Sequence, residues 1–164
     1  MIFVTVGTHE QPFDRLIKCI DQMVADGKIK EEVIIQKGYT DYEPQNCKSY
    51  KLIGYDDMKK YIAEARIVIT HGGPASFVAP LSIGKIPVVV PRQYKYNEHV
   101  NDHQLEFARE VEKRMKNIIV AEDEKEIIDA IEKYNEKVSK MSLIQNSNNK
   151  KFNKEFKTLI EGML

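Results

Sequence analysis

The chain has 164 residues, and its 25 Lys and Arg residues balance 25 Asp and Glu residues to give a formal net charge of zero. This length fits one domain of ordinary size, and the balanced charge argues against a general nucleic-acid binder, whose domain is normally basic. With 42% hydrophobic residues and no run of 18 apolar residues, the chain is predicted to be globular and without a membrane-spanning helix. Cys19 and Cys47 show no CxxC spacing and are interpreted as reduced thiols of a cytosolic protein.

Short apolar runs rich in β-branched residues recur along the chain and predict buried strands. Runs without polar alternation suit strands that are covered on both faces, as in a parallel sheet. These runs cover residues 2–6, 33–35, 67–70, 87–90 and 118–120, and a weaker candidate covers residues 50–54.

Segments with helical spacing of apolar residues lie between the predicted strands. Their apolar stripes begin at Phe13, Met58, Val100 and Ile127, with Asp56 and Asn97 as the expected starts of the second and third helices. Strand and helix therefore alternate to about residue 140, which predicts a Rossmann-like, doubly wound α/β fold with a mostly parallel sheet. The ligand site of such a fold lies at the carboxyl ends of its strands.

The end of the chain has a different composition. Residues 142–150 are polar and rich in Asn and Ser, which indicates a linker, and apolar spacing over residues 150–163 predicts an amphipathic helix. The lysine-rich stretch from Lys137 to Lys157 is either a solvated helix face or a docking surface for an anionic membrane or an acidic partner. We therefore expect a domain over residues 1–140, followed by a linker and helix over residues 141–164.

Residues 69–76, with the sequence Ile-Thr-His-Gly-Gly-Pro-Ala-Ser, carry the strongest functional signal. They leave a predicted strand, cross two glycines and enter a helix, whose first N–H groups and partial positive charge suit a phosphate. Ser76 can add a hydroxyl donor. The alternative is a tight turn between strand and helix that binds no ligand. The segment is neither a Walker loop nor a GxGxxG motif.

Residues 90–104 follow another predicted strand and form the densest polar run of the chain. Carboxylate and amide side chains in this run, such as Asp102 and Gln104, can hold sugar hydroxyls. His99 and His103 have a four-residue spacing that suits zinc on one helical face. The glutamate of HExxH and a third ligand are absent from this motif, so we expect no metal site.

Residues 7–12 directly follow the first predicted strand. They form either an ordinary surface loop or part of a site in which backbone and hydroxyl groups contact a phosphate. The expected contacts are Gly7 and Thr8 for the phosphate and His9 or Glu10 as a catalytic base.

The turns Gly38–Tyr39 and Gly54–Tyr55 also follow apparent strands. An aromatic ring or a backbone amide at either turn can contact a flat base. Each is otherwise a plain turn.

Several separated motifs, in order, resemble glycosyltransferase family 28, C-terminal domain. They are Val-Thr-Val-Gly-Thr at residues 4–8, Pro-Phe-Asp-Arg-Leu at 12–16, Ile-Thr-His-Gly-Gly at 69–73 and Gly-Lys-Ile-Pro-Val-Val-Val-Pro at 84–91. The closer likeness is to the small bacterial subunits of two-part exopolysaccharide and capsule glycosyltransferases, to which residues 92–104 add support. These subunits are similar to the soluble subunit of the eukaryotic enzyme that adds the second N-acetylglucosamine to dolichol-linked chitobiose.

The resemblance implies a GT-B-type donor domain in the catalytic subunit of a heteromeric, UDP-sugar-dependent hexosyltransferase. Such a subunit moves a sugar from a UDP-sugar to a polyprenyl-diphosphate-linked saccharide in exopolysaccharide or capsule biosynthesis. The resemblance further implies a membrane-anchored, acceptor-binding partner subunit and a cytoplasmic, peripherally membrane-associated location. It implies no nucleic acid, no obligatory metal and no other cofactor. A GT-B enzyme also has an acceptor domain of comparable size, for which we expect no room in 164 residues.

The resemblance also implies roles for particular residues. The family cradles the diphosphate with its His-Gly-Gly turn and contacts the donor sugar with an acidic residue and an amide. The residues so implied are His71, Gly72, Gly73 and Ser76 for the diphosphate, and Asp102 and Gln104 for the sugar. Many relatives hold the uridine ribose with an acidic residue at the position of Ala79, so we expect Glu98 or the partner to contact the ribose here.

Two alternatives to a catalytic subunit remain. One is a non-catalytic, nucleotide-sugar-binding or scaffold subunit that enhances a partner transferase, which the alanine at position 79 favours. The other is a self-sufficient homo-oligomer that builds its acceptor site across subunits.

Overall fold

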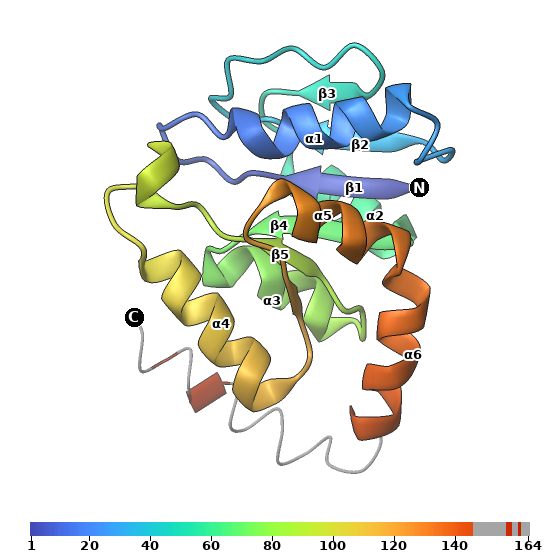
Figure 1. Ribbon diagram of the computed structural model, residues 1–164, viewed down its shortest axis with the longest axis vertical. Helices are drawn as coiled ribbons and strands as arrows, with labels where there is room; N and C mark the ends of the chain where they lie inside the picture. Colours follow the sequence, from blue (N-terminus) through green and yellow to red (C-terminus); the bar gives the residue numbers. More distant parts are fainter. Residues whose placement is uncertain (146–156, 159–160, 162–164) are drawn as a thin grey trace.

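The computed structural model describes residues 1–145, 157–158 and 161, and its centre is a six-stranded sheet (Figure 1). All strand pairs are parallel, and the strand order is β3-β2-β1-β4-β5-β6. The strands are β1 (Ile2–Thr5), β2 (Val33–Gln36), β3 (Lys48–Tyr50), β4 (Ile67–His71), β5 (Val88–Val90) and β6 (Ile119–Val120). The helices are α1 (Asp14–Ala25), α2 (Tyr55–Glu64), α3 (Pro74–Ser82), α4 (His103–Met115), α5 (Glu124–Glu132) and α6 (Tyr134–Gln145), with a short 3₁₀ helix, η1 (Tyr94–Tyr96).

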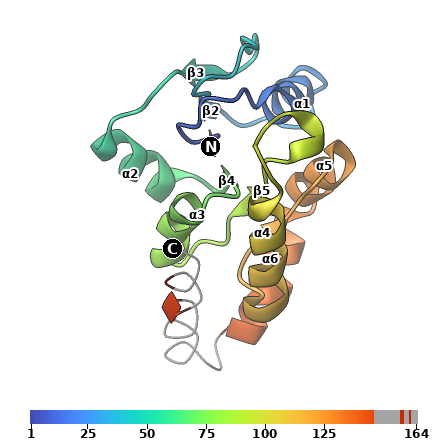
Figure 2. The same ribbon diagram turned by 90° about the vertical axis from the view of Figure 1, so that its left-hand side faces the viewer.

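Helices cover both faces of this sheet, as Figure 2 shows for α2 and α3 on one side and α1 and α5 on the other. Side chains alternate between the faces along each strand. Ile2 and Val4 of β1 pack in the cluster that includes α1 and α5, whereas Phe3 packs with residues of α2 on the opposite face. The strands are apolar throughout because both faces are covered.

The strand order reverses between β1 and β4. The chain builds outward from β1 to β3, returns through α2 to β4 beside β1, and then builds in the other direction to β6. The carboxyl ends of β1 and β4 therefore border a crevice, which is where open sheets of this kind bind their ligands. The predicted fold class is confirmed.

The weakest strand prediction was displaced. β3 covers Lys48–Tyr50, whereas the apolar pattern pointed to residues 50–54. This edge strand pairs only with β2, and its side chains are partly or fully exposed, so its sequence carries no apolar run. The other strands coincide with their predicted runs to within two residues at each end.

Two predicted helix starts are wrong. α2 begins at Tyr55 behind Gly54, so Asp56 lies in the first turn rather than at the N-cap. Asn97 has a φ of 58° and ends η1, and α4 begins only at His103. Asparagine tolerates this left-handed conformation because its short side chain can hydrogen-bond locally.

The connection between β2 and β3, residues 37–47, contains no helix and is fastened to α1 instead. The buried carboxylate of Asp21 accepts hydrogen bonds from the Tyr42 hydroxyl at 2.5 Å and from the N–H groups of Gln45 at 3.0 Å and Asn46 at 2.8 Å. Burial raises the pKa of Asp21, but these hydrogen bonds outweigh burial and lower it overall. The ionised carboxylate thus anchors this connection to α1, where two parallel strands are usually joined by a crossover helix.

The predicted boundary near residue 140 falls inside α6, which continues through Gln145. The remainder of the predicted linker and last helix lies outside the described residues, except that residues 157, 158 and 161 are helical. In the part of the chain that the structure describes, no helix combines the length and apolar character needed to cross a bilayer.

Candidate functional site

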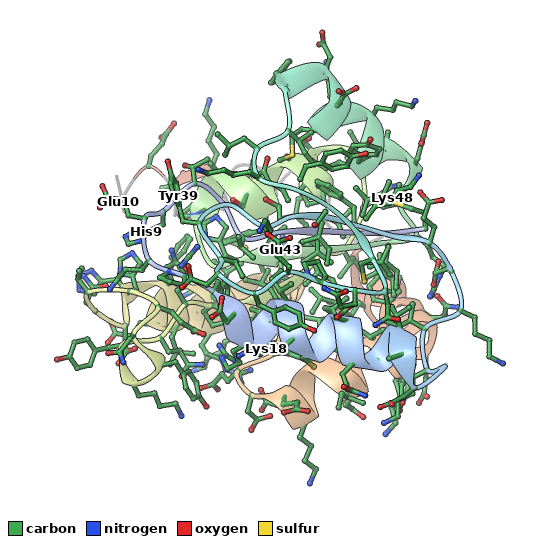
Figure 3. The ribbon with its side chains drawn as sticks, turned by 90° about the horizontal axis from the view of Figure 1, so that it is seen from above. His9, Glu10, Lys18, Tyr39, Glu43 and Lys48 are labelled. Atoms are coloured by element: carbon green, nitrogen blue, oxygen red, sulfur yellow. The ribbon has the colours of Figure 1, made fainter. Side chains whose placement is uncertain are left out.

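The residues singled out in the sequence gather at the carboxyl edge of the sheet. Gly7 to Glu10 follow β1, the His-Gly-Gly turn begins at the last residue of β4, and residues 91–102 follow β5. Figure 3 shows His9, Glu10 and Tyr39 toward one end of the molecule and Lys48, the first residue of β3, toward the opposite end. Three predicted segments, distant in sequence, are thereby brought to one rim.

The His71 ring is enclosed between two glycines. A Cβ atom at Gly7 or at Gly73 would overlap ring atoms of His71 well inside van der Waals contact. Gly7 also has a φ of 77°, which glycine adopts readily. These glycines therefore make room for the histidine, in addition to the ligand approach for which the sequence suggested them.

The His71 ring also organises the start of α3. Its Nδ1 accepts the N–H of Gly73 at 3.0 Å, and its Nε2 lies 2.6 Å from Oγ of Ser76. Because Nδ1 is an acceptor, the proton of the neutral ring is assigned to Nε2, which donates to Ser76. The Ser76 hydroxyl then has its own proton free to donate.

The His71 ring is neutral at physiological pH. Burial lowers the pKa of His71 to about 4, and the positive charge of Arg92 acts in the same direction. A neutral imidazole is required for the acceptor role of Nδ1, so the charge state and the hydrogen-bond pattern agree.

This lowered pKa predicts a pH-dependent stability. Between pH 6.5 and pH 4 the unfolded chain protonates His71 and the folded chain does not, so the free energy of unfolding falls as pH falls. The contribution of His71 is at most about 1.4 kcal/mol per pH unit. Urea unfolding of the native chain and of His71→Gln between pH 4 and 7 measures it, and the variant should show the shallower slope. Identical slopes would contradict a neutral, buried His71.

Gln104 joins the β4 and β5 turns to α4. Its Oε1 accepts the N–H groups of Gly72 and of Arg92, each at 3.1 Å. A Cβ atom at Gly72 would lie 2.9 Å from Cβ of Gln104 and 3.1 Å from Cα of Pro91, so only glycine allows this close approach. Asp102 similarly accepts the N–H of Tyr94 at 2.9 Å.

These contacts change which groups of the His-Gly-Gly turn can donate hydrogen bonds to a diphosphate. The N–H groups of Gly72 and Gly73 donate to side chains of the protein itself. The donors that remain beside them are the Ser76 hydroxyl, the amide NH₂ of Gln104 and the first turn of α3, where the helix dipole is positive.

Glu98, the expected ribose contact, is engaged within the chain. It is 2% exposed, and both its oxygens bind Arg15 of α1, each at 3.0 Å. Its Oε1 also accepts the N–H of Gln93 at 3.2 Å. The physical reason is that a buried carboxylate needs a cation and hydrogen-bond donors, and Glu98 takes them from within the chain.

Arg92 is a fully buried cation under the rim. Its guanidinium donates to the carbonyls of Gln11 at 2.7 Å, Glu98 at 3.1 Å and Val6 at 2.8 Å, and it lies 4.9 Å from the centre of the Phe13 ring. Burial lowers its pKa to about 10, which leaves it charged at neutral pH. Arg92 therefore binds the loop after β1 to the loop after β5 and adds positive charge beneath the crevice.

The rings of His9 and His99 contact each other in a tilted arrangement, with centres 4.7 Å apart and planes at 34°. Nδ1 of His9 accepts the N–H of Gln11 at 3.1 Å, so the proton of the neutral His9 ring is assigned to Nε2. Because α4 begins at His103, His99 lies before the helix. His99 and His103 therefore do not form an i, i+4 pair on one helical face. Among the described residues no group of three or more His, Cys, Asp or Glu side chains is placed to hold a metal ion.

An apolar cleft of about 630 Å³ lies between α2 and α3. Its walls come from the loop after β1, the turn before α2, and the facing sides of α2 and α3, and they include Thr8, Ile53, Tyr55, Met58, Ala79 and Ile83. Ala79 is one helical turn beyond Ser76, so the two share a face of α3. A cleft of this size and character fits a small organic ligand. Tyr55, from the Gly54–Tyr55 turn that the sequence suggested for a flat base, is one of its lining residues.

Two arginines that organise the rim were not predicted as site residues. Arg15 lies 83 positions before its partner Glu98, too far for the sequence to indicate the pair. Arg92 has no acidic residue three or four positions after it that would indicate a buried ion pair. Their signal is weak, because an arginine in an amphipathic helix or after a strand is normally exposed.

A parallel sheet in this order, with the N-terminus of α3 at its switch point, defines a Rossmann-like domain. Residues 1–163 match glycosyltransferase family 28 C-terminal domain, and the chain belongs to this family. The predicted family is confirmed.

Individual proteins agree with this assignment. The chain is 36% identical over 121 residues to UDP-N-acetylglucosamine transferase subunit ALG13 of Homo sapiens, and 30% identical over 120 residues to the subunit of that name from Mus musculus. Each alignment covers 68% of this chain and 10% of the relative, so the chain spans about a tenth of the length of these proteins.

Solved structures share the fold. The glycosyltransferase SnogD from Streptomyces nogalater matches 74% of this chain and 30% of its own, with a TM-score of 0.52 and 21% identity. A crystal structure described as the glycotransferase of kitacinnamycin matches 96% of this chain and 39% of its own, with a TM-score of 0.59 and 13% identity. At these identities the likeness shows the fold alone, and the predicted GT-B-type fold is confirmed.

Proposed function

We propose that the chain is the donor-binding subunit of a UDP-sugar-dependent hexosyltransferase. The observation that carries this proposal is the apolar cleft between α2 and α3, whose α3 wall begins at Ala79, one helical turn beyond Ser76. A nucleoside in this cleft would have the Ser76 hydroxyl within a turn of α3 as a donor for its diphosphate. Membership of the family and the likeness to a UDP-N-acetylglucosamine transferase subunit support the choice of a UDP-sugar.

The donor is proposed to lie along the rim in three parts. The base enters the cleft against Ile53 and Tyr55, and the diphosphate meets the Ser76 hydroxyl at the positive end of α3. The sugar then reaches Asp102 and Gln104 at the start of α4, with Gly7 and Thr8 beside the phosphates.

Transfer displaces UDP from the anomeric carbon and develops negative charge on the β-phosphate. This developing negative charge is stabilised by the Ser76 hydroxyl proton, the α3 dipole and the positive charge of Arg92. All three are already in place, so none has to reorganise during the reaction. The acceptor hydroxyl also loses a proton to a base. We favour the exposed carboxylate of Glu10 over His9 for this step, because the assigned tautomer of His9 leaves its Nε2 protonated.

The acceptor and its setting are proposed from the family resemblance. The acceptor is a polyprenyl-diphosphate-linked saccharide of exopolysaccharide or capsule biosynthesis, held by a membrane-anchored partner subunit on the cytoplasmic side. The transfer is proposed to need no metal and no other cofactor.

Calorimetric titration of the chain with UDP, UDP-sugars, ADP and GDP tests donor binding. We expect UDP to bind and the purine nucleotides to bind at least tenfold more weakly. Ser76→Ala should weaken UDP binding about tenfold through loss of one hydrogen bond to a charged group, whereas Ser139→Ala on α6 should not change it. Equal affinity for UDP and ADP, or an unaffected Ser76→Ala, would contradict the proposed seat.

A second candidate is a non-catalytic subunit that binds the nucleotide-sugar and enhances a partner transferase. The carboxylates of Glu98 and Asp102 are both engaged within the chain, which favours it. UDP-sugar binding without transfer in the presence of the partner, in both the native chain and Glu10→Gln, would establish this candidate.

A further inference from the structure

The polar groups that line the apolar cleft carry no negative charge. The side chains of Thr8, Gln36, Lys59 and Ser82 supply its polar atoms together with the Tyr55 hydroxyl, and no Asp or Glu is among its lining residues within the described part of the chain. Among the described lining residues, the only ionised side chain on the cleft wall is therefore that of Lys59, whose ammonium is a donor.

Two of these polar side chains are already used inside the protein. Gln36 donates through Nε2 to Oγ1 of Thr5 at 3.0 Å and accepts the N–H of Ile53 through Oε1 at 2.8 Å. Ser82 donates its hydroxyl proton to the carbonyl of Ala79 at 2.7 Å. Strong acceptors for a ligand hydroxyl are thus scarce in the cleft.

In the proposed pose the ribose lies beside an apolar side chain of α3. A nucleoside diphosphate with its base against Ile53 and its phosphates at Ser76 places its ribose over the α3 face between them. The side chain that lies one turn beyond Ser76 on this face is the methyl group of Ala79, which is partly buried against the cluster around Phe3.

We propose that the cleft binds the nucleoside without reading the ribose 2′-hydroxyl, so that ribose and 2′-deoxyribose nucleotides bind alike. This inference rests on the proposed function, because it assumes a nucleotide in the cleft. Rossmann-like domains usually recognise this hydroxyl with an Asp or Glu carboxylate. A hydrogen bond to such a charged group changes affinity about tenfold or more, whereas a neutral or water-exposed contact changes it only slightly.

Titration of the full chain with UDP and with 2′-deoxyuridine diphosphate tests the proposal. We expect the two dissociation constants to agree within about threefold. Tight binding of UDP with at least tenfold weaker binding of the deoxy nucleotide would overturn the inference and leave the donor-binding function intact. Failure of both nucleotides to bind would overturn the inference and the proposed nucleotide seat together.

Ala79→Glu and its neutral counterpart Ala79→Gln provide a second measurement. The two side chains have nearly the same size, so a change in packing affects both, and only the glutamate adds a charged acceptor beside the ribose. We expect Ala79→Glu to prefer UDP over the deoxy nucleotide about tenfold and Ala79→Gln to prefer it less than threefold. If neither variant gains a preference while both still bind UDP, the ribose does not lie over Ala79 and the inference fails.

Discussion

Gly73→Ala is expected to weaken UDP binding about tenfold, as much as Ser76→Ala, because it removes the orientation of the Ser76 hydroxyl. The backbone at Gly73, with φ −68° and ψ 128°, is open to any residue, so the substitution introduces no backbone strain. The added methyl group overlaps the His71 ring and forces it to move. Displacement of His71 breaks its hydrogen bonds to Gly73 and Ser76, which leaves the Ser76 hydroxyl without its orientation.

Gly27→Ala is the matched control for this prediction. Gly27 lies in the turn between α1 and β2, has a φ of 75° and has open space around its Cα hydrogens. The control should lose about 1 kcal/mol of unfolding free energy through left-handed strain and keep the UDP affinity of the native chain. Calorimetry and urea unfolding of both variants separate binding from stability. Native affinity in Gly73→Ala would mean that His71 does not organise the site.

Arg92→Met is expected to lower the free energy of unfolding by about 3–5 kcal/mol. The guanidinium serves three carbonyls, those of Val6, Gln11 and Glu98, and methionine leaves them without these donors. At 0% exposure, Arg92 has no water to replace the lost hydrogen bonds. A domain of this size is normally stable by about 5–15 kcal/mol, so the loss is large.

Urea unfolding at pH 7 measures this loss, with two further variants as references. Arg92→Lys keeps the charge but not the planar fork, and should lose a smaller part of the stability. Lys95→Met, on the exposed part of the same loop, should change it by less than about 0.5 kcal/mol. If Arg92→Met does not fold, the comparison of Arg92→Lys with Lys95→Met still decides. A loss below about 1 kcal/mol in Arg92→Lys and in any folded Arg92→Met would show that the arginine does not hold the two loops together.

The sequence predicted the elements that are buried on both faces and misplaced the element that is not. β1 and β4 are continuous apolar runs because helices cover both sides of them. β3 is an edge strand with exposed Lys48 and Tyr50, so no hydrophobic pattern marks it. The start of α4 was misplaced because Asn97 suits a helix start and a left-handed turn equally well.

The candidate site divides in the same way. The His-Gly-Gly turn was predicted because glycines after a buried strand have a local physical meaning. The engagement of Glu98 was not, because its partner Arg15 lies 83 positions away and only the sheet brings them together. Predicted roles in donor contact for Asp102, Gln104, Thr8 and the remaining rim residues stay predictions until a ligand is bound.

The loop after β5 separates anchoring residues from contact residues. Arg92, Gln93 and Glu98 are buried and hold its two ends, whereas the side chains of Tyr94, Lys95, Tyr96 and Val100 are exposed. Substitutions at exposed positions generally change stability little, whereas substitutions of buried, hydrogen-bonded groups change it strongly. The exposed side chains of this loop can therefore change in evolution without loss of the buried contacts that hold its backbone in place. Descendants of this domain can in this way come to recognise different molecules at the rim while they keep the same loop conformation.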